Sequence, residues 1–177
     1  AVFVYADQLR DQPIELTLDL PEGWQAASGM EQPDPGRFVA PHYDRLVDSP
    51  IEAGTFDLVS FEAAGMTVDF LIHGVWGGDE ERLVHDMSAL VEATAEVFGS
   101  ADRGLPTDYY LFMLHSGDDL GGGTEYYNST LVHTDPRAFW DDDRWQSFLG
   151  LMAHEFFHTW NVKRFRPASI DRYDYQN

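Results

Sequence analysis

Hydrophobic and polar positions alternate with a period of two in short runs over the first part of the chain. The clearest run covers residues 14–20, and similar runs cover residues 55–61 and 66–72. Alternation of this kind predicts strands with one buried face. We therefore expect residues 1–76 to be the C-terminal part of a β-rich N-terminal domain with antiparallel strands.

The spacing of the apolar positions becomes helical from Asp79 onward. One face of this predicted helix consists of Leu83, Met87, Leu90, Val91, Thr94 and Phe98. Acidic residues favour its N-terminal end, and Gly99 can end it. A second helix is predicted from about Arg144. Its core-facing positions are Trp145, Phe148, Leu149, Met152 and Phe156.

Two strands are predicted between these helices. Residues 109–114 form an uninterrupted apolar run, which is typical of a buried strand. Residues 124–132 form the second run, after a break at three consecutive glycines. Together the elements predict an α+β fold in which residues 77–177 are part of a second domain.

The charge balance limits the classes of partner. The chain of 177 residues holds 11 basic and 31 acidic residues, a formal net charge of −20. A surface this negative repels phosphate groups, so we expect no nucleic-acid partner. No run approaches the roughly 18–20 apolar residues of a membrane-spanning helix, so we expect no membrane insertion. The chain has no cysteine, so any metal must be held by His, Asp or Glu.

The chemistry is concentrated in the pentapeptide HEFFH at residues 154–158, inside the second predicted helix. Residues four apart lie about 5–6 Å from each other on one helical face. His154 and His158 can therefore bind one Zn²⁺ through bonds of about 2.0–2.1 Å. Glu155 lies roughly 100° round the helix and is our candidate general base for the water that zinc activates. The alternative is that these are ordinary residues of an amphipathic helix, since short motifs also occur by chance.

A catalytic zinc normally has three protein ligands, and two histidines leave one unassigned. A third histidine in the metzincin pattern is excluded, because Asn161 and Arg164 occupy the positions that need Gly and His. After Thr159 there is no Glu, and Asp171 and Asp174 lie in a stretch typical of a surface turn. We therefore expect the third ligand to lie outside residues 1–177.

Three segments carry longer motifs. Residues 154–167 read HEFFHTWNVKRFRP, residues 121–130 read GGGTEYYNST, and residues 44–52 read DRLVDSPIE. They are similar to the patterns H-E-x-x-H-x-W-N-V-K-R-I-R-P, G-G-G-x-E-x-x-N-S-T and D-x-L-V-D-S-P-I-E. With these motifs the chain resembles the glycyl aminopeptidase family, metallopeptidase family sixty-one.

The resemblance implies a β domain followed by a thermolysin-like zincin catalytic domain, of which residues 77–177 would be the N-terminal part. It also implies that His154 and His158 are zinc ligands and that Glu155 is the catalytic base. The third ligand would be a Glu downstream, in the remainder of the same polypeptide. The function it implies is a zinc-dependent aminopeptidase that hydrolyses the first bond of peptides with a free N-terminus and prefers a small N-terminal residue such as Gly or Ala. The rival function is a non-catalytic binding or structural module with an incomplete zinc site.

The glycine-rich segment also resembles the strand that related aminopeptidases place along the substrate backbone. In those enzymes a glutamate of this strand binds the free amino terminus. Glycines let an extended peptide approach an edge strand, so Gly122, Gly123 and Glu125 are our candidates for substrate binding. The alternative is a glycine turn before a surface strand.

The remaining polar residues are assigned structural roles. Lys163, Arg164 and Arg166 follow a helix C-terminus, where cations are favoured, and we expect them to pair with the dipole and the acidic surface. Asn161 is either a hydrogen-bond partner of a ligand histidine or a helix cap. The other histidines lack partner spacing and are treated as structural or exposed: His42, His73, His85, His115 and His133.

Overall fold

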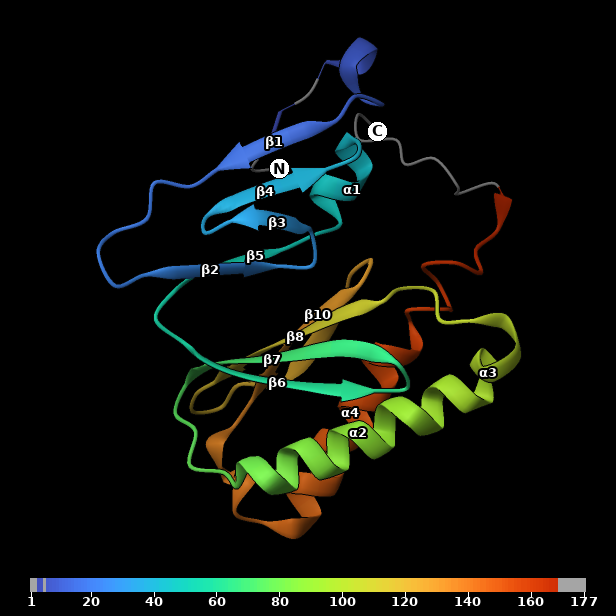
Figure 1. Cartoon of the computed structure of the whole chain (residues 1–177). Coiled ribbons are helices and arrows are strands. Elements are labelled where there is room, and N and C mark those ends of the chain that lie inside the picture. The colour runs from blue at the N-terminus through green and yellow to red at the C-terminus, as the bar shows by residue number, and fades with distance from the viewer. Residues whose placement is uncertain (1–2, 5, 169–177) are drawn as a thin grey trace.

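The computed structural model describes residues 3, 4 and 6–168, and it has an α+β architecture, as predicted (Figure 1). Two small antiparallel sheets lie at the N-terminal end of the chain. The three-stranded sheet has the order β1 (Ile14–Thr17), β4 (Arg37–Ala40), β3 (Glu31–Asp34). The two-stranded sheet pairs β2 (Gln25–Ser28) with β5 (Ile51–Gly54). Two short helical segments accompany them, η1 (Asp7–Leu9) and α1 (Tyr43–Val47).

A five-stranded sheet forms the centre of the molecule. Its order is β6 (Asp57–Ala63), β7 (Met66–Gly74), β8 (Tyr109–Ser116), β10 (Ser129–Thr134), β9 (Gly122–Glu125). The two outer pairs are antiparallel, whereas β7 with β8 and β8 with β10 are parallel. The sheet is therefore mixed, and β9 is one of its edge strands.

Two long helices cover one face of this sheet, as Figure 1 shows. They are α2 (Glu80–Val97) and α4 (Asp142–Phe157), and the shorter segments on this side are α3 (Ser100–Arg103) and η2 (Pro136–Phe139). The core between helices and sheet is built on alternate strand positions such as Phe70 and Phe112, which are fully buried and stack at 5.8 Å between ring centroids. Burial of this apolar face, at about 25 cal/mol per Å², is the main force that holds the helices on the sheet.

The opposite face of the sheet packs toward the N-terminal strands. Leu71, Leu111 and Met113 form a second buried cluster there, together with Ala27 of β2 and Phe56. Because side chains alternate between the faces of a strand, neighbouring residues of β7 and β8 serve different cores. Strand β8 is consequently apolar almost without interruption, whereas β7 alternates at first and is continuously apolar only over residues 70–72.

Most predicted elements are confirmed, and one is wrong. The two helices begin within about two residues of the expected positions, and Asp79 caps α2 by accepting from the backbone N–H groups of Glu81 and Arg82. The single strand expected at residues 124–132 is instead the antiparallel pair β9 and β10. The chain reverses at residues 126–128, where the Tyr126 N–H donates to the Ser129 carbonyl at 2.8 Å.

The expected division between residues 76 and 77 stays a prediction. Strands β6 and β7, which were expected in the N-terminal domain, share a sheet with β8, β9 and β10. This grouping favours a division nearer residue 55, between β5 and β6. Asp171 and Asp174 lie outside the described residues.

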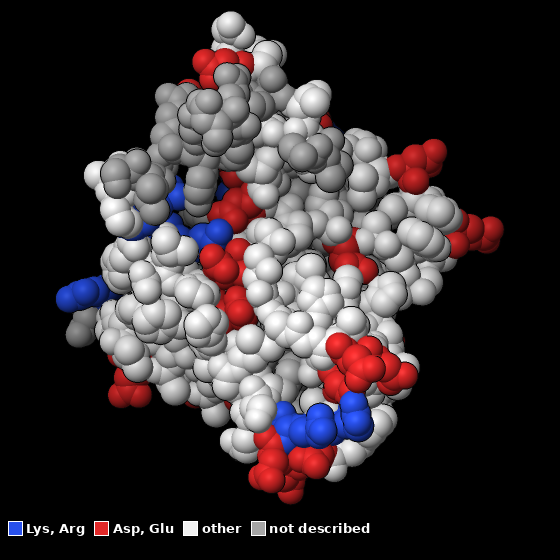
Figure 2. Space-filling model, turned by 180° about the vertical axis from the view of Figure 1, so that it is seen from behind, with Lys and Arg blue, Asp and Glu red and all other residues white. Residues whose placement is uncertain are grey.

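Charged side chains are distributed unevenly over the surface. Figure 2 shows acidic side chains scattered over the face opposite to that of Figure 1, while basic side chains gather there in small groups, mostly beside acidic ones. In the part of the chain that the structure describes, no helix combines the length and the apolar character needed to cross a membrane.

Candidate active site

Helix α4 carries the HEFFH pentapeptide at its C-terminal end. Asp141 caps the helix by accepting from the Arg144 N–H at 3.0 Å, and acidic residues fill its first turn, where the helix dipole favours negative charge. Met152 and Phe156 are fully buried against the sheet. These contacts fix the rotation of the helix, so the residues on its other faces have defined directions.

The two histidines of the pentapeptide meet at one point. Nε2 of His154 lies 3.2 Å from Nε2 of His158, and the rings are nearly perpendicular. The Asn161 carbonyl can only accept, so the His158 Nδ1 that lies 2.5 Å from it carries a proton. A neutral His158 therefore presents an Nε2 lone pair toward His154. It is the backbone of Asn161, and not its side chain, that orients this histidine.

Glu155 is the buried carboxylate beside this pair. The residue is 4% exposed, and its Oε2 has no hydrogen-bond partner among the described residues. Burial raises the pKa of the Glu155 carboxyl; the imidazoles of His154 and His158 oppose this increase, and Glu125 adds to it. A buried polar atom without a partner is costly, and at functional sites it marks a place for a ligand or an ion.

Strand β9 brings the glycine-rich segment against Glu155. A Cβ on Gly123 would lie 2.6 Å from Glu155 Oε1 and 2.8 Å from Cδ, so only glycine fits here without displacement. Glu125, two residues on, shares a cluster with Glu155 and His158 in which ligand atoms lie within 4.8 Å of one another. Gly122 pairs with His133 and has a φ of +98°, a conformation that favours glycine.

The predicted site residues are thus brought together, with Gly122 at the margin. The two imidazole nitrogens are donors that suit zinc, and the carboxylates of Glu155 and Glu125 lie beside them. Ligand atoms bound to one tetrahedral zinc at about 2.0–2.1 Å are about 3.3 Å apart, and the two Nε2 atoms lie 3.2 Å from each other. The orphaned Glu155 oxygen and this spacing both fit a metal ion.

Charged residues that follow the pentapeptide connect the three motif segments. Lys163, with a side chain that is 9% exposed, pairs with Asp48 at 2.7 Å across 115 residues of sequence. Arg164 donates to the Tyr127 carbonyl at 2.5 Å. The expected pairing with acidic residues and with the end of the helix is found in part, since Lys163 pairs with Asp48 and Arg164 also donates to the Thr159 carbonyl at 3.0 Å. Both cations in addition reach other elements inside the structure.

Tyr127 is the centre of these contacts. The guanidinium carbons of Arg45 and Arg164 each lie 4.0 Å from the centroid of its ring. Arg45 also donates to Asn128 Oδ1 at 2.7 Å and to the Gly29 carbonyl at 2.9 Å. Contacts between a guanidinium and a ring are favourable by about 0.5–2 kcal/mol each. Arg45 and Arg164 thereby hold the chain reversal at residues 126–128, which follows Glu125. The spacing of residues along the sequence does not predict these contacts.

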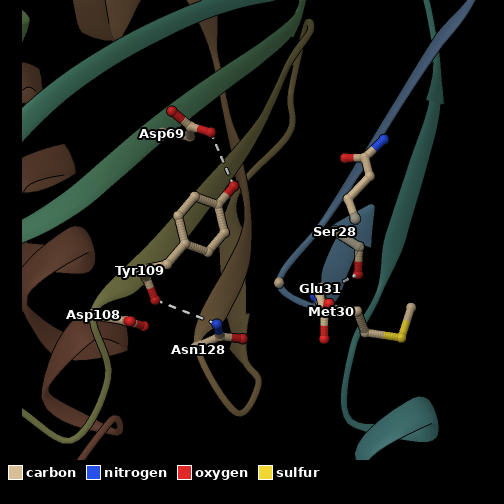
Figure 3. A pocket seen from close by; sticks show the side chains of 9 residues that line it. Ser28, Met30, Glu31, Asp69, Asp108, Tyr109 and Asn128 are labelled. Atoms are coloured by element: carbon tan, nitrogen blue, oxygen red, sulfur yellow. Dashed lines mark hydrogen bonds between the residues drawn. The ribbon is translucent and has the colours of Figure 1, made fainter. Parts of the chain in front are cut away.

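A separate cavity of about 600 Å³ lies between the N-terminal strands and the central sheet (Figure 3). Asp69, Tyr109 and Asn128 face Met30 and other residues of the β2–β3 connection across it. The Tyr109 hydroxyl donates to Asp69 at 3.0 Å. None of the predicted site residues lines this cavity.

Two family models match the ends of the chain. The Peptidase M61 N-terminal domain matches residues 1–55, and M61 glycyl aminopeptidase matches residues 147–177. The resemblance stated from the three motifs is therefore confirmed. A comparison with curated proteins finds no match.

Solved structures resemble most of the fold of this chain. A protein of the aminopeptidase N family from Idiomarina loihiensis is 29% identical with a TM-score of 0.88, over 97% of this chain and 31% of that one. An M1 zinc metallopeptidase from Deinococcus radiodurans is 12% identical with a TM-score of 0.51, over 84% of this chain and 33% of that one, which shows a similar fold alone. The chain spans about a third of the length of these two proteins.

Proposed function

Since the chain matches the Peptidase M61 N-terminal domain at one end and M61 glycyl aminopeptidase at the other, we propose that it supplies part of the active site of a zinc-dependent aminopeptidase. The observation that carries the proposal is the pair of Nε2 atoms 3.2 Å apart beside the buried Glu155. The proposed substrate is a peptide with a free N-terminus and a small first residue, Gly or Ala. The rival is a non-catalytic module that retains an incomplete zinc site.

His154 and His158 would hold the zinc ion through Nε2, and a third protein ligand would complete the site. When bound, zinc supplies Lewis acidity that lowers the pKa of water toward about 7. The hydrogen bond from His158 Nδ1 to the Asn161 carbonyl sets the tautomer that this role needs. Loss of such a hydrogen bond to a ligand histidine typically lowers the metal affinity by about 10–100-fold.

Glu155 would move the proton. Its carboxylate takes a proton from the attacking water and delivers it to the nitrogen of the leaving amine. Burial raises the pKa of the Glu155 carboxyl, which brings it closer to the pKa values of the water and the leaving amine. A carboxyl with such a pKa can both accept and deliver the proton. The lack of a competing hydrogen bond at Oε2 among the described residues leaves this oxygen available.

Strand β9 would hold the substrate. It is an edge strand of the described sheet, so a peptide can pair with its free backbone edge. Gly123 keeps this edge close to Glu155, and Glu125 supplies a carboxylate for the ammonium group of the first residue. A carboxylate at this end of the strand favours a peptide whose first residue lies at the site, because that residue carries an ammonium group. A peptide chain that extends beyond the site has no charge at this position.

The test is an assay on the complete protein with Gly- and Ala-linked chromogenic substrates, each beside its N-acetylated form. We expect cleavage of the free-amine substrates only, and loss of cleavage on chelation that added Zn²⁺ reverses. Glu155→Gln should lower kcat about 10²–10⁴-fold, with zinc content unchanged. Glu125→Gln should mainly raise KM.

The matched control is Glu96→Gln, which makes the same change on the exposed surface of α2 and should leave the rate unaltered. Equal cleavage by wild type and Glu155→Gln would refute the catalytic role. A complete protein that retains no zinc and cleaves neither substrate form would support the rival module.

A further inference from the structure

We propose that Glu52, His73 and His115 form a second binding site for a divalent transition metal of the Zn²⁺ class. The three residues were each given a structural or motif role from sequence, and the proposed peptidase site uses none of them. They come from three strands: β7 and β8 are neighbours in the central sheet, and β5 belongs to the two-stranded sheet.

The geometry of the cluster is convergent. The carboxylate of Glu52 lies between the two rings, with Oε1 at 3.0 Å from His73 Nδ1 and Oε2 at 2.8 Å from His115 Nε2. One ligand atom from each residue lies within 4.8 Å of the other two. The ring centroids of the two histidines are 5.3 Å apart. Three donors from separate elements therefore face one point.

These distances and donors suit a small divalent ion. Donor atoms around one tetrahedral zinc are about 3.3 Å apart, and one ligand atom from each of the three residues already lies within 4.8 Å of the others. The 2.8 and 3.0 Å contacts involve different oxygens of Glu52, so a shared ion would take the place of these two hydrogen bonds. Two imidazoles and a carboxylate are ligands that zinc and its neighbours in the transition series accept, and Ca²⁺ and Mg²⁺ prefer all-oxygen sites. Three protein ligands leave a fourth position for water.

The cluster is distinct from the peptidase site because it lies on the other face of the central sheet. Residues paired across strands point to the same face, and His73, His115 and His133 are paired in register across β7, β8 and β10. His133 is in turn paired with Gly122. The next residue, Gly123, faces Glu155 and α4 instead.

The surroundings hold the donors in place and leave them reachable. The His73 ring packs beside Gly54, where a Cβ would lie 3.7 Å from its Cε1, and the His115 ring meets His133 edge to face at 5.4 Å. The side chain of His73 is 47% exposed and that of Glu52 is 14% exposed, so an ion can enter from solvent to a partly buried carboxylate. A bound ion would tie β5 to the two central strands.

The competing explanation is that the carboxylate only accepts hydrogen bonds from two neutral imidazoles. Both explanations predict that Glu52 matters for stability, so stability alone does not separate them. Metal binding separates them, because loss of one ligand must weaken a metal site whether or not the fold is affected.

The experiment uses the complete protein with His154→Ala and His158→Ala, which removes the first pair of imidazoles. Titration with Co²⁺, followed by its visible absorption, and with Zn²⁺, followed by calorimetry, should show one bound ion per chain. Adding His73→Gln or Glu52→Gln should weaken that binding at least tenfold. Adding His85→Gln, a change at a histidine on α2 that is 81% exposed, should not.

Two further readouts keep the test decisive. His73 is half-exposed, so its replacement is expected to fold, and circular dichroism of each variant checks this. Added Zn²⁺ should raise the Tm of the doubly substituted background by more than it raises the Tm of its Glu52→Gln derivative. Absence of binding, or binding that His73→Gln and Glu52→Gln leave intact, would overturn the proposal and leave a hydrogen-bonded cluster only. Since no step requires activity, failure of the peptidase proposal would not decide this one.

Discussion

Replacement of Gly123 by alanine is the sharpest test of how β9 and α4 work together. The new Cβ would lie 2.6 Å from Glu155 Oε1, and ordinary contact begins near 3.4 Å, so the carboxylate must move by about 0.8 Å. A misplacement of about 1 Å at a reacting group can cost about 10²-fold in rate. We therefore expect kcat to fall on the order of 100-fold, which corresponds to about 2.7 kcal/mol in the activation barrier.

The measurement is steady-state cleavage of a Gly-linked chromogenic substrate, with urea unfolding on the same samples. The control is Gly121→Ala in the same glycine run, where a Cβ meets nothing within 4 Å and the rate should stay within about twofold of wild type. Stability of Gly123→Ala should also fall, because the new Cβ would lie 2.9 Å from Glu155 Cγ as well, so the whole buried side chain must shift. A kcat within threefold of wild type would refute the close contact as a determinant of catalysis.

Three further predictions concern stability and are checked by urea or thermal unfolding. Gly150→Ala should raise the free energy of unfolding by about 0.5–1 kcal/mol, because this helical glycine has open space around its Cβ position; a decrease would contradict that. Asp141→Ala should lower it by about 1 kcal/mol through loss of the α4 cap, and Asp141→Asn should restore most of the loss. Phe112→Ala should lower it by about 3–5 kcal/mol, because this ring is fully buried between other aromatic rings; a cost below 1 kcal/mol would contradict the packing described.

Local patterns predicted the elements that depend on local physics. Helices α2 and α4 followed from apolar periodicity and acidic N-termini, and the HEFFH spacing placed His154 and His158 on one face. These features depend on residues within a few positions of each other. The sequence therefore contains their signal directly.

The features that were missed depend on sequence-distant contacts. The reversal between β9 and β10 contains Tyr126 and Tyr127, which favour strands, and the contacts that hold it come from Asp48, Arg45 and Arg164. The parallel pairing of β7 with β8 leaves no mark on alternation within either strand. The pair His73 and His115 could not be predicted from the sequence either, because these residues become neighbours only through the register of β7 and β8.

The bond between Asp48 and Lys163 has a consequence for how this protein can be divided and recombined. Asp48 lies before the central sheet and Lys163 lies just after the pentapeptide, and the backbone of Asp48 also accepts from the Tyr127 N–H at 3.3 Å. The N-terminal segment is therefore not an exchangeable module. A chimera that takes it from a different protein would need to bring its own equivalents of Arg45 and Asp48, or the reversal that carries Glu125 would lose its support.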